Sequence, residues 1–350
     1  MKPAIVVAAA MLALAAPAAA QEAKSFKSWS ALCDNLKTCT AFGYTDEAAD
    51  THGFVRLVRA AGPNAPARVT LRTETEDGDD GKRPLAWSVS VDGHVPPGLQ
   101  AVATTGTDEE RRAELSPAQA AALIAAVRNG SQLTLAGGKA PITLSLAGSS
   151  AALLWIDDRQ GRVGTVTALA AKGARPASAV PAAPAAPVVR AAPAISQAGL
   201  PTRAPKAILD NPKLKDCDDP GAKSEDTTIA RLGAHQILWG VPCSAGAYNL
   251  LSVLFVSDEA GRGAREIVPP DAEPNNPDAD DELMNINYDP ETRTLTAFAK
   301  ARGIGDCGEA ATWVWDGQGF RLLDETVMGQ CQGVVSDDWP SLYHAVRAPG

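Results

Sequence analysis

Apolar and polar residues alternate along several short stretches of the chain. In the first half the alternation is clearest at Val69–Leu71, Trp87–Val91 and Ile142–Leu146. Successive side chains of a strand point to opposite faces, so each stretch predicts a strand with one buried face. Further strands are expected in the second half, at Thr228–Leu238, Ala247–Val256, Thr294–Ala299, Thr312–Trp315 and Phe320–Leu323. The turn Asp316-Gly-Gln-Gly319 predicts a hairpin between the last two.

Two stretches of the first half have the spacing and end signals of helices. Ser116 and Gln119 form a capping box around Pro117, and Gly130 ends the helix. A second helix is expected from Ser149 to Gly161. We therefore expect an α+β sheet domain in the first half and a mainly antiparallel β domain in the second.

A change in composition separates these two domains. Residues 173–206 contain seven prolines and twelve alanines, four basic residues and no acidic ones. Such a proline-rich stretch favours an extended spacer over a packed core. The sequence thus predicts domains at residues 21–172 and 207–350, joined by a Pro/Ala-rich linker at residues 173–206.

The N-terminus has the pattern of a secretory signal peptide over residues 1–20. Lys2 precedes the apolar run Ala4–Ala15, and Ala18–Ala20 provides a small-residue cleavage site before Gln21. The run is shorter than the ~20 residues that a membrane-spanning helix needs. We expect a cleaved signal, a periplasmic location and no transmembrane segment afterwards.

Six cysteines fit an oxidising compartment, where an even number indicates three disulfides. Zinc and redox sites favour tighter C-x2-C spacing, so no metal ligand is predicted. Cys33 and Cys39 are alone in the first domain and are expected to pair. Three arrangements stay open for the other four, of which Cys217–Cys243 with Cys307–Cys331 closes the shortest loops.

The charge is unevenly distributed. Residues 21–172 carry 16 basic and 17 acidic side chains, a net charge of −1, whereas residues 207–350 carry 11 and 24, a net charge of −13. An acidic domain repels phosphate backbones, so nucleic acid is excluded as a partner. The charge would attract a basic envelope protein, although it is also what keeps an exported protein soluble.

No catalytic motif is present: the sequence lacks a G-x-S-x-G elbow, an H-E-x-x-H helix and a Walker loop. Gly303–Gly308 matches G-x-G-x-x-G, but a predicted strand follows it where a dinucleotide site needs a helix. No cofactor is therefore expected. Arginine, tryptophan and a constrained glycine loop are typical of binding surfaces. The candidate binding surface consists of Arg302, Gly303, Gly305, Asp306, Glu309, Trp313 and Trp315.

Several segments, most of them with a cysteine, resemble an exported family known as domain of unknown function 1176. They are Trp29–Asn35, Cys39–Gly43, Leu144–Gly148, Trp155–Arg162, Trp239–Asn249, Gly303–Gly308 and Cys331–Gly333. The resemblance implies six characteristic cysteines, and all six positions are filled here. The first domain is also distantly similar to invasion-associated locus B proteins, which share its Trp-x3-Cys opening. Neither resemblance implies an activity.

The functional hypothesis from the sequence is a non-catalytic binding or protective protein of the envelope. One alternative is an inhibitor of a basic envelope enzyme, such as a lysozyme-type muramidase. Another is a hydrolase that uses carboxylates near the Gly303–Gly308 loop, with Asp306 and Glu309 as the first candidates. A purely structural envelope component is a further class.

Overall fold

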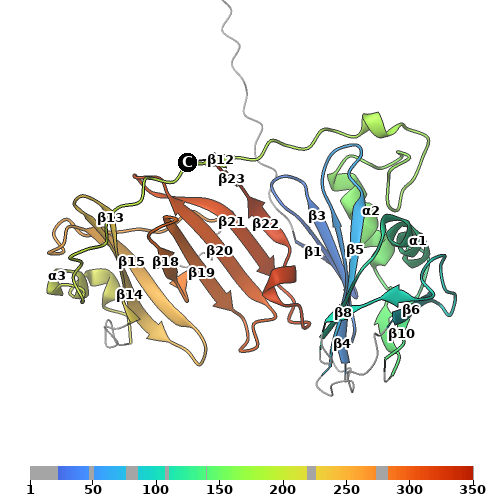
Figure 1. Cartoon of the computed structure of the whole chain (residues 1–350), viewed down its shortest axis with the longest axis horizontal. Coiled ribbons are helices and arrows are strands. Elements are labelled where there is room, and N and C mark those ends of the chain that lie inside the picture. Colours follow the sequence, from blue (N-terminus) through green and yellow to red (C-terminus); the bar gives the residue numbers. More distant parts are fainter. Residues whose placement is uncertain are drawn as a thin grey trace, which may run out of the picture.

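The protein is built mostly from antiparallel β-sheets, arranged as two halves that pack side by side (Figure 1). The computed structural model describes residues 23–46, 51–75, 86–106, 110–138, 140–218, 226–272 and 283–349. The predicted signal peptide at residues 1–20 lies outside these ranges. Within them, no helix is long and apolar enough to cross a membrane.

The first half contains two sheets and two longer helices. A seven-stranded sheet has the order β1-β2-β3-β4-β5-β9-β8, and a four-stranded sheet the order β11-β10-β6-β7. The strands are β1 (Lys24–Phe26), β2 (Trp29–Cys33), β3 (Cys39–Tyr44), β4 (Thr51–Arg59), β5 (Ala67–Thr75), β6 (Ala86–Val91), β7 (Val102–Ala103), β8 (Thr105–Gly106), β9 (Glu110–Glu114), β10 (Gln132–Ala136) and β11 (Ile142–Ser145). The helices are α1 (Pro117–Val127) and α2 (Ser149–Arg159). One core, centred on Trp29, Trp87, Leu71 and Leu153, joins both sheets and both helices.

The second half also contains two larger sheets. One has the order β13-β14-β15-β16, with β17 paired to β15, and the other the order β18-β19-β20-β21-β22. The strands are β13 (Thr228–Gly233), β14 (Gln236–Ala245), β15 (Leu250–Ser257), β16 (Arg265–Glu266), β17 (Leu283–Met284), β18 (Asn287–Asp289), β19 (Thr294–Lys300), β20 (Gly308–Trp315), β21 (Phe320–Met328) and β22 (Ser341–His344). A short helix, α3 (Lys206–Leu209), places Ile208 against the outer face of the first sheet.

The expected α+β fold class is wrong, because the described residues form mostly β-sheet with only three α-helices, one of them a single turn. Both longer helices were predicted at their observed places, but several strands were missed. In β3 all six residues are buried, so there is no alternation to detect. In β9, by contrast, four of the five residues are charged, and the strand forms by pairing with β5.

One predicted strand of the second half is in fact two. Thr228–Leu238 contains a turn at Ala234–His235, so β13 ends at Gly233 and β14 starts at Gln236. The two pair as an antiparallel hairpin with an irregularity between Arg231 and Gly233. The residues on both sides of the turn favour a strand, and neither Ala234 nor His235 is a typical turn residue, so the sequence did not show the reversal.

The proline-rich stretch follows the edges of both halves (Figure 1). Val180 is buried after a 3-10 turn at Ala177–Ala179. Strand β12 (Val188–Val189) then pairs in parallel with β23 (Val346–Arg347), and the Ala192 N–H donates to the Trp315 carbonyl. That this stretch separates two independent domains stays a prediction.

The two halves meet through an apolar cluster of their own. Phe42, Tyr44 and Phe54 from strands β3 and β4 pack against Cys307, Met328, Val334 and Trp339 from the second half. This cluster places the Cys307–Cys331 region beside the first half.

Candidate functional site

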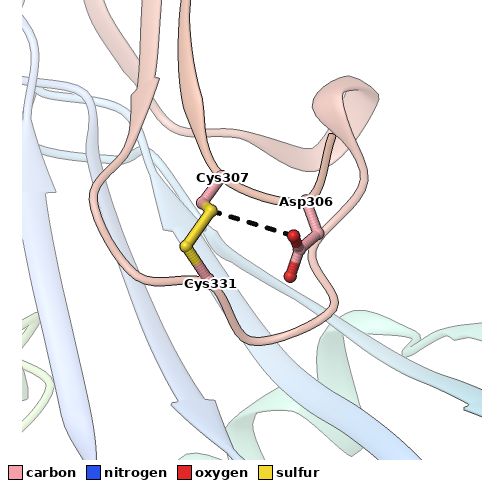
Figure 2. Close-up of side chains that lie close together, drawn as sticks. All are labelled: Asp306, Cys307 and Cys331. Atoms are coloured by element: carbon pink, nitrogen blue, oxygen red, sulfur yellow. Dashed lines mark hydrogen bonds between the residues drawn. A yellow bond between two sulfur atoms is a disulfide. The ribbon is translucent and has the colours of Figure 1, made fainter. Parts of the chain in front are cut away.

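The six cysteines form three disulfides, and the C-terminal four adopt the arrangement with the shortest loops. The pairs are Cys33–Cys39, Cys217–Cys243 and Cys307–Cys331, with sequence separations of 6, 26 and 24 residues. The third pair ties the start of β20 to the loop after β21, next to the junction of the halves. Figure 2 shows it beside Asp306.

Asp306 is buried and holds two neighbouring segments together. The Arg302 guanidinium donates to both carboxylate oxygens, at 2.6 Å from Nε and 2.5 Å from Nη2. The Gly333 N–H donates to Oδ2 at 2.8 Å, and Arg302 Nη2 also donates to the Cys331 carbonyl at 3.2 Å. Burial by itself would raise the pKa of Asp306, but the hydrogen bonds from Arg302 and Gly333 outweigh it and lower that pKa. Asp306 is thus an ionised brace for the Gln330–Gly333 loop.

The glycines of the G-x-G-x-x-G match shape the turn into this disulfide. Gly308 has a φ of +136°, and a Cβ there would lie 2.0 Å from the Ala299 carbonyl oxygen, so a side chain is excluded. Gly305 has a φ of +70°, and its N–H donates to the Arg302 carbonyl. As expected from the sequence, β20 follows, and there is no helix to receive a phosphate.

The seven residues of the candidate binding surface do not form one surface. Trp313 and Trp315 lie in the core of the second half, because alternate residues of β20 share its buried face. Trp313 Nε1 donates to the Pro270 carbonyl at 2.6 Å. Asp306 is only 4% exposed, whereas Glu309 is exposed. Arg302, Gly303 and Gly305 remain accessible at the loop, beside Ile304, which is 76% exposed.

The carboxylate and the two sulfurs of Figure 2 lie close together but lack the chemistry of a metal site. One oxygen of Asp306 and the sulfurs of Cys307 and Cys331 lie within 4.8 Å of one another. The two sulfurs are bonded to each other, so neither provides the thiolate that binds a metal. The close approach follows from the disulfide.

The loop that Asp306 braces forms one wall of a polar cleft between the halves. The cleft has a volume of about 740 Å³. Three segments line it from the first half: the β1–β2 turn, the end of β3, and the facing parts of β10 and β11. The second half contributes Gln330–Gln332. The lining residues are Lys27, Ser28, Tyr44, Thr45, Asp46, Ser131, Gln132, Thr143, Leu144, Ser145, Gln330, Cys331 and Gln332.

Most of these side chains end in a hydroxyl or an amide, groups that both donate and accept hydrogen bonds. Gln332 Oε1 is buried and has no hydrogen-bond partner within the described residues. Gln330 Nε2 donates to Ser25 Oγ at 3.1 Å across the junction. Burial raises the pKa of the Tyr44 phenol, which therefore stays protonated beside Ser30. The cleft thus presents a largely uncharged hydrogen-bonding wall, with Lys27 and Asp46 as its charged members.

Sequence reasoning missed this cleft. Its residues come from segments more than 300 positions apart, and isolated Ser, Thr and Gln residues carry no motif. The only sequence features that pointed to this region were the Gly303–Gly308 loop and Cys331. They were selected for a glycine motif and for disulfide pairing, not as parts of a cleft. They position one wall of the cleft, and Cys331 is one of its lining residues.

A buried ion cluster also joins the halves. Asp338 is 1% exposed and pairs with three arginines of the first half: Arg72 at 2.8 Å, Arg112 at 3.3 Å and Arg56 at 3.5 Å. Burial lowers the pKa of Arg56, and Asp338 partly offsets this. The sequence gave no reason to connect residues so far apart.

Comparisons with known proteins cover nearly all of the described residues and assign the chain no activity. The sequence pattern of a family described as a protein of unknown function (DUF1176) matches residues 23–346. A protein of Escherichia coli (strain K12), named uncharacterized protein YpfG, is 29% identical over 357 residues, which covers 93% of each chain. No solved structure matches.

Proposed function

We propose that this chain, which belongs to the DUF1176 family of proteins of unknown function, is a non-catalytic binding protein of the bacterial envelope. One observation carries the proposal: the polar cleft of about 740 Å³ between its halves. Ligand sites are concave and lie preferentially at the interfaces between domains.

The chemistry of the cleft favours a neutral, hydroxyl-rich ligand, such as a short glycan of the envelope. Ser, Thr and Gln side chains match sugar hydroxyls, since both kinds of group donate and accept. Gln332 Oε1 offers an acceptor that lacks a protein partner within the described residues. The disulfide and the Arg302–Asp306 pair fix the Gln330–Gly333 loop in advance, which reduces the ordering cost of binding.

Titration with neutral glycan fragments, followed by NMR of the whole oxidised protein, tests this proposal. We expect Gln132→Ala with Gln332→Ala to weaken binding about thirtyfold, because the two lost hydrogen bonds contribute roughly 1 kcal/mol each. Gln318→Ala, at an exposed turn outside the cleft, is the matched control. Failure of every neutral glycan to bind, or equal binding by the double variant, would contradict the proposal.

The cellular location proposed with this function is the periplasm, to which a signal peptide at residues 1–20 would direct the protein. Its support is the pairing of all six cysteines in three disulfides, which is typical of exported proteins. N-terminal sequencing of the protein from a periplasmic extract should start at Gln21. The similarity of the first half to invasion-associated locus B proteins stays a prediction from its opening motif.

A second candidate, inhibition of a basic envelope enzyme, is favoured by the net charge of −13 over residues 207–350. Such a complex forms by long-range attraction and weakens as salt rises. A lysozyme-type muramidase assay at low and high salt would detect it.

The observations favour a hydrolase less, because Arg302 and Gly333 occupy the Asp306 carboxylate and its lowered pKa is unsuited to a general acid.

A further inference from the structure

A second cavity lies in the first half, and its lining shares no residue with the polar cleft. Its volume is about 460 Å³. It is lined by α1, by the Pro63–Ala67 turn between β4 and β5, and by the Val166–Lys172 segment after α2. The walls are mostly the apolar side chains of Pro63, Pro66, Ile124, Val166 and Leu169.

The charged residues that line this cavity all have the same sign. They are Arg59, Arg128 and Lys172, and no acidic residue is among the lining side chains. The whole chain carries a net charge of −9. The lining of this apolar cavity is therefore positively charged, although the net charge of the whole chain is negative.

Arg59 is the cation whose position calls for a ligand. It is only 5% exposed, at the end of β4. Its Nε donates to the Ala65 carbonyl at 3.2 Å, but its buried Nη1 has no hydrogen-bond partner within the described residues. A buried guanidinium donor without an acceptor costs free energy.

The surroundings of Arg59 increase its need for an anion. Burial, and then the nearby Arg162 cation, lower the pKa of Arg59 to about 10. Asp157 opposes this, but its two oxygens already accept the N–H groups of Leu169, Ala170 and Ala171. Arg59 thus stays charged at neutral pH, while the Asp157 carboxylate is engaged by backbone N–H groups.

We propose that this cavity binds a small amphipathic carboxylate, with its head group at Arg59 and its hydrocarbon chain along the proline, alanine and isoleucine wall. A carboxylate accepts charge-assisted hydrogen bonds from a guanidinium, while Arg128 and Lys172 supply further positive charge. Burial of the ligand's hydrocarbon chain against the apolar wall adds favourable free energy of binding, so affinity depends on both parts of the ligand.

Calorimetric titration of the whole oxidised protein with decanoate tests the proposal, together with octanoate, acetate and decanol. Decanoate is expected to bind more tightly than octanoate, by up to about fourfold for each buried CH2. Acetate lacks the chain and decanol lacks the charge, so both should bind at least tenfold more weakly. Decanol binding as tightly as decanoate, or no carboxylate binding, overturns the proposal.

Two substitutions test whether decanoate binds in this cavity with its carboxylate at Arg59. Arg59→Met keeps much of the side-chain volume and removes the charge, so decanoate should bind at least tenfold more weakly while the unliganded protein remains folded. Ala125→Phe fills the cavity from an exposed position of α1, and should abolish binding with Arg59 still present. Ala118→Phe, also exposed on α1 but outside the lining, is the matched control. Unchanged binding in either of the first two variants, each shown to be folded by circular dichroism, also overturns the proposal.

Discussion

Single residues near the junction of the halves act through charge, and Asp306 is the clearest case. Its carboxylate contacts Arg302, on the same turn, and Gly333, on the loop after β21. The sequence selected Asp306 as a candidate for acid/base chemistry. The tertiary structure gives it a different role, since a carboxylate whose oxygens are both occupied stabilises a loop.

Asp306 predicts a pH dependence of stability. Its pKa in the folded protein lies below the ordinary value of 3.8. Between these two values the unfolded chain binds more protons, so stability rises with pH there. The contribution is fully present above the ordinary value and is lost as pH falls through the folded pKa.

We therefore expect Asp306→Asn to lower the free energy of unfolding by about 1–3 kcal/mol near neutral pH, and the difference to shrink below about pH 4. Urea unfolding between pH 2 and pH 7 measures it. Asp337→Asn, at an exposed site, should follow the native profile. A difference that stays constant down to pH 2 would refute this role.

At the scale of elements, disulfides hold short strands and irregular loops in place. Cys33–Cys39 closes the β2–β3 hairpin, whereas the other two bridges close loops about four times longer. Helix α1 needs no such bridge, because the Ser116–Gln119 capping box and its buried face toward the core stabilise it. Disulfide stabilisation is therefore concentrated in the second half.

The loss of stability on removal of a single disulfide should increase with the length of the loop that it closes. In the loop-entropy model the Cys33–Cys39 bridge contributes about 2.4 kcal/mol and each of the others about 3.5 kcal/mol. Paired Cys→Ala variants, compared by urea unfolding, measure these differences.

With dithiothreitol present, we expect proteases to cleave residues 207–350 before residues 21–172. Equal protease resistance of the two halves would count against this order.

At the scale of the whole molecule, an apolar cluster and an ion cluster join the halves. Asp338 lies at the centre of the ion cluster and contacts arginines of β4, β5 and β9. Arg72 is almost as deeply buried as Asp338, so the pair depends on mutual neutralisation.

Asp338→Ala should therefore lower the free energy of unfolding by about 3 kcal/mol, since it leaves Arg72 and its neighbours buried without this partner. Part of the loss is offset by Glu110, which also pairs with Arg72. Asp337→Ala, exposed and adjacent, should change stability by no more than about 0.5 kcal/mol. Equal stability of the two variants would show that the ion cluster does not hold the halves together.

Local patterns were sufficient for part of this fold. They located α1 by its capping box, α2 by its apolar spacing, the β20–β21 hairpin by its glycine turn, and an even set of cysteines that pairs in three disulfides. Each of these features depends on residues close together in the chain, or on a residue type with one dominant chemistry. The same patterns failed for β3 and β9, where complete burial or strand pairing replaced alternation.

The amino-acid sequence by itself determined the helices, the hairpin and the cysteine content of this protein, because those depend on short-range spacing. Only the tertiary structure decided the β-rich class, the burial of Trp313 and Trp315, the polar cleft and the cavity at Arg59. Their physical reason is shared. Clefts, cavities and ion clusters form where segments distant in sequence pack, and the side chains that line them are ordinary residues until that packing brings them together.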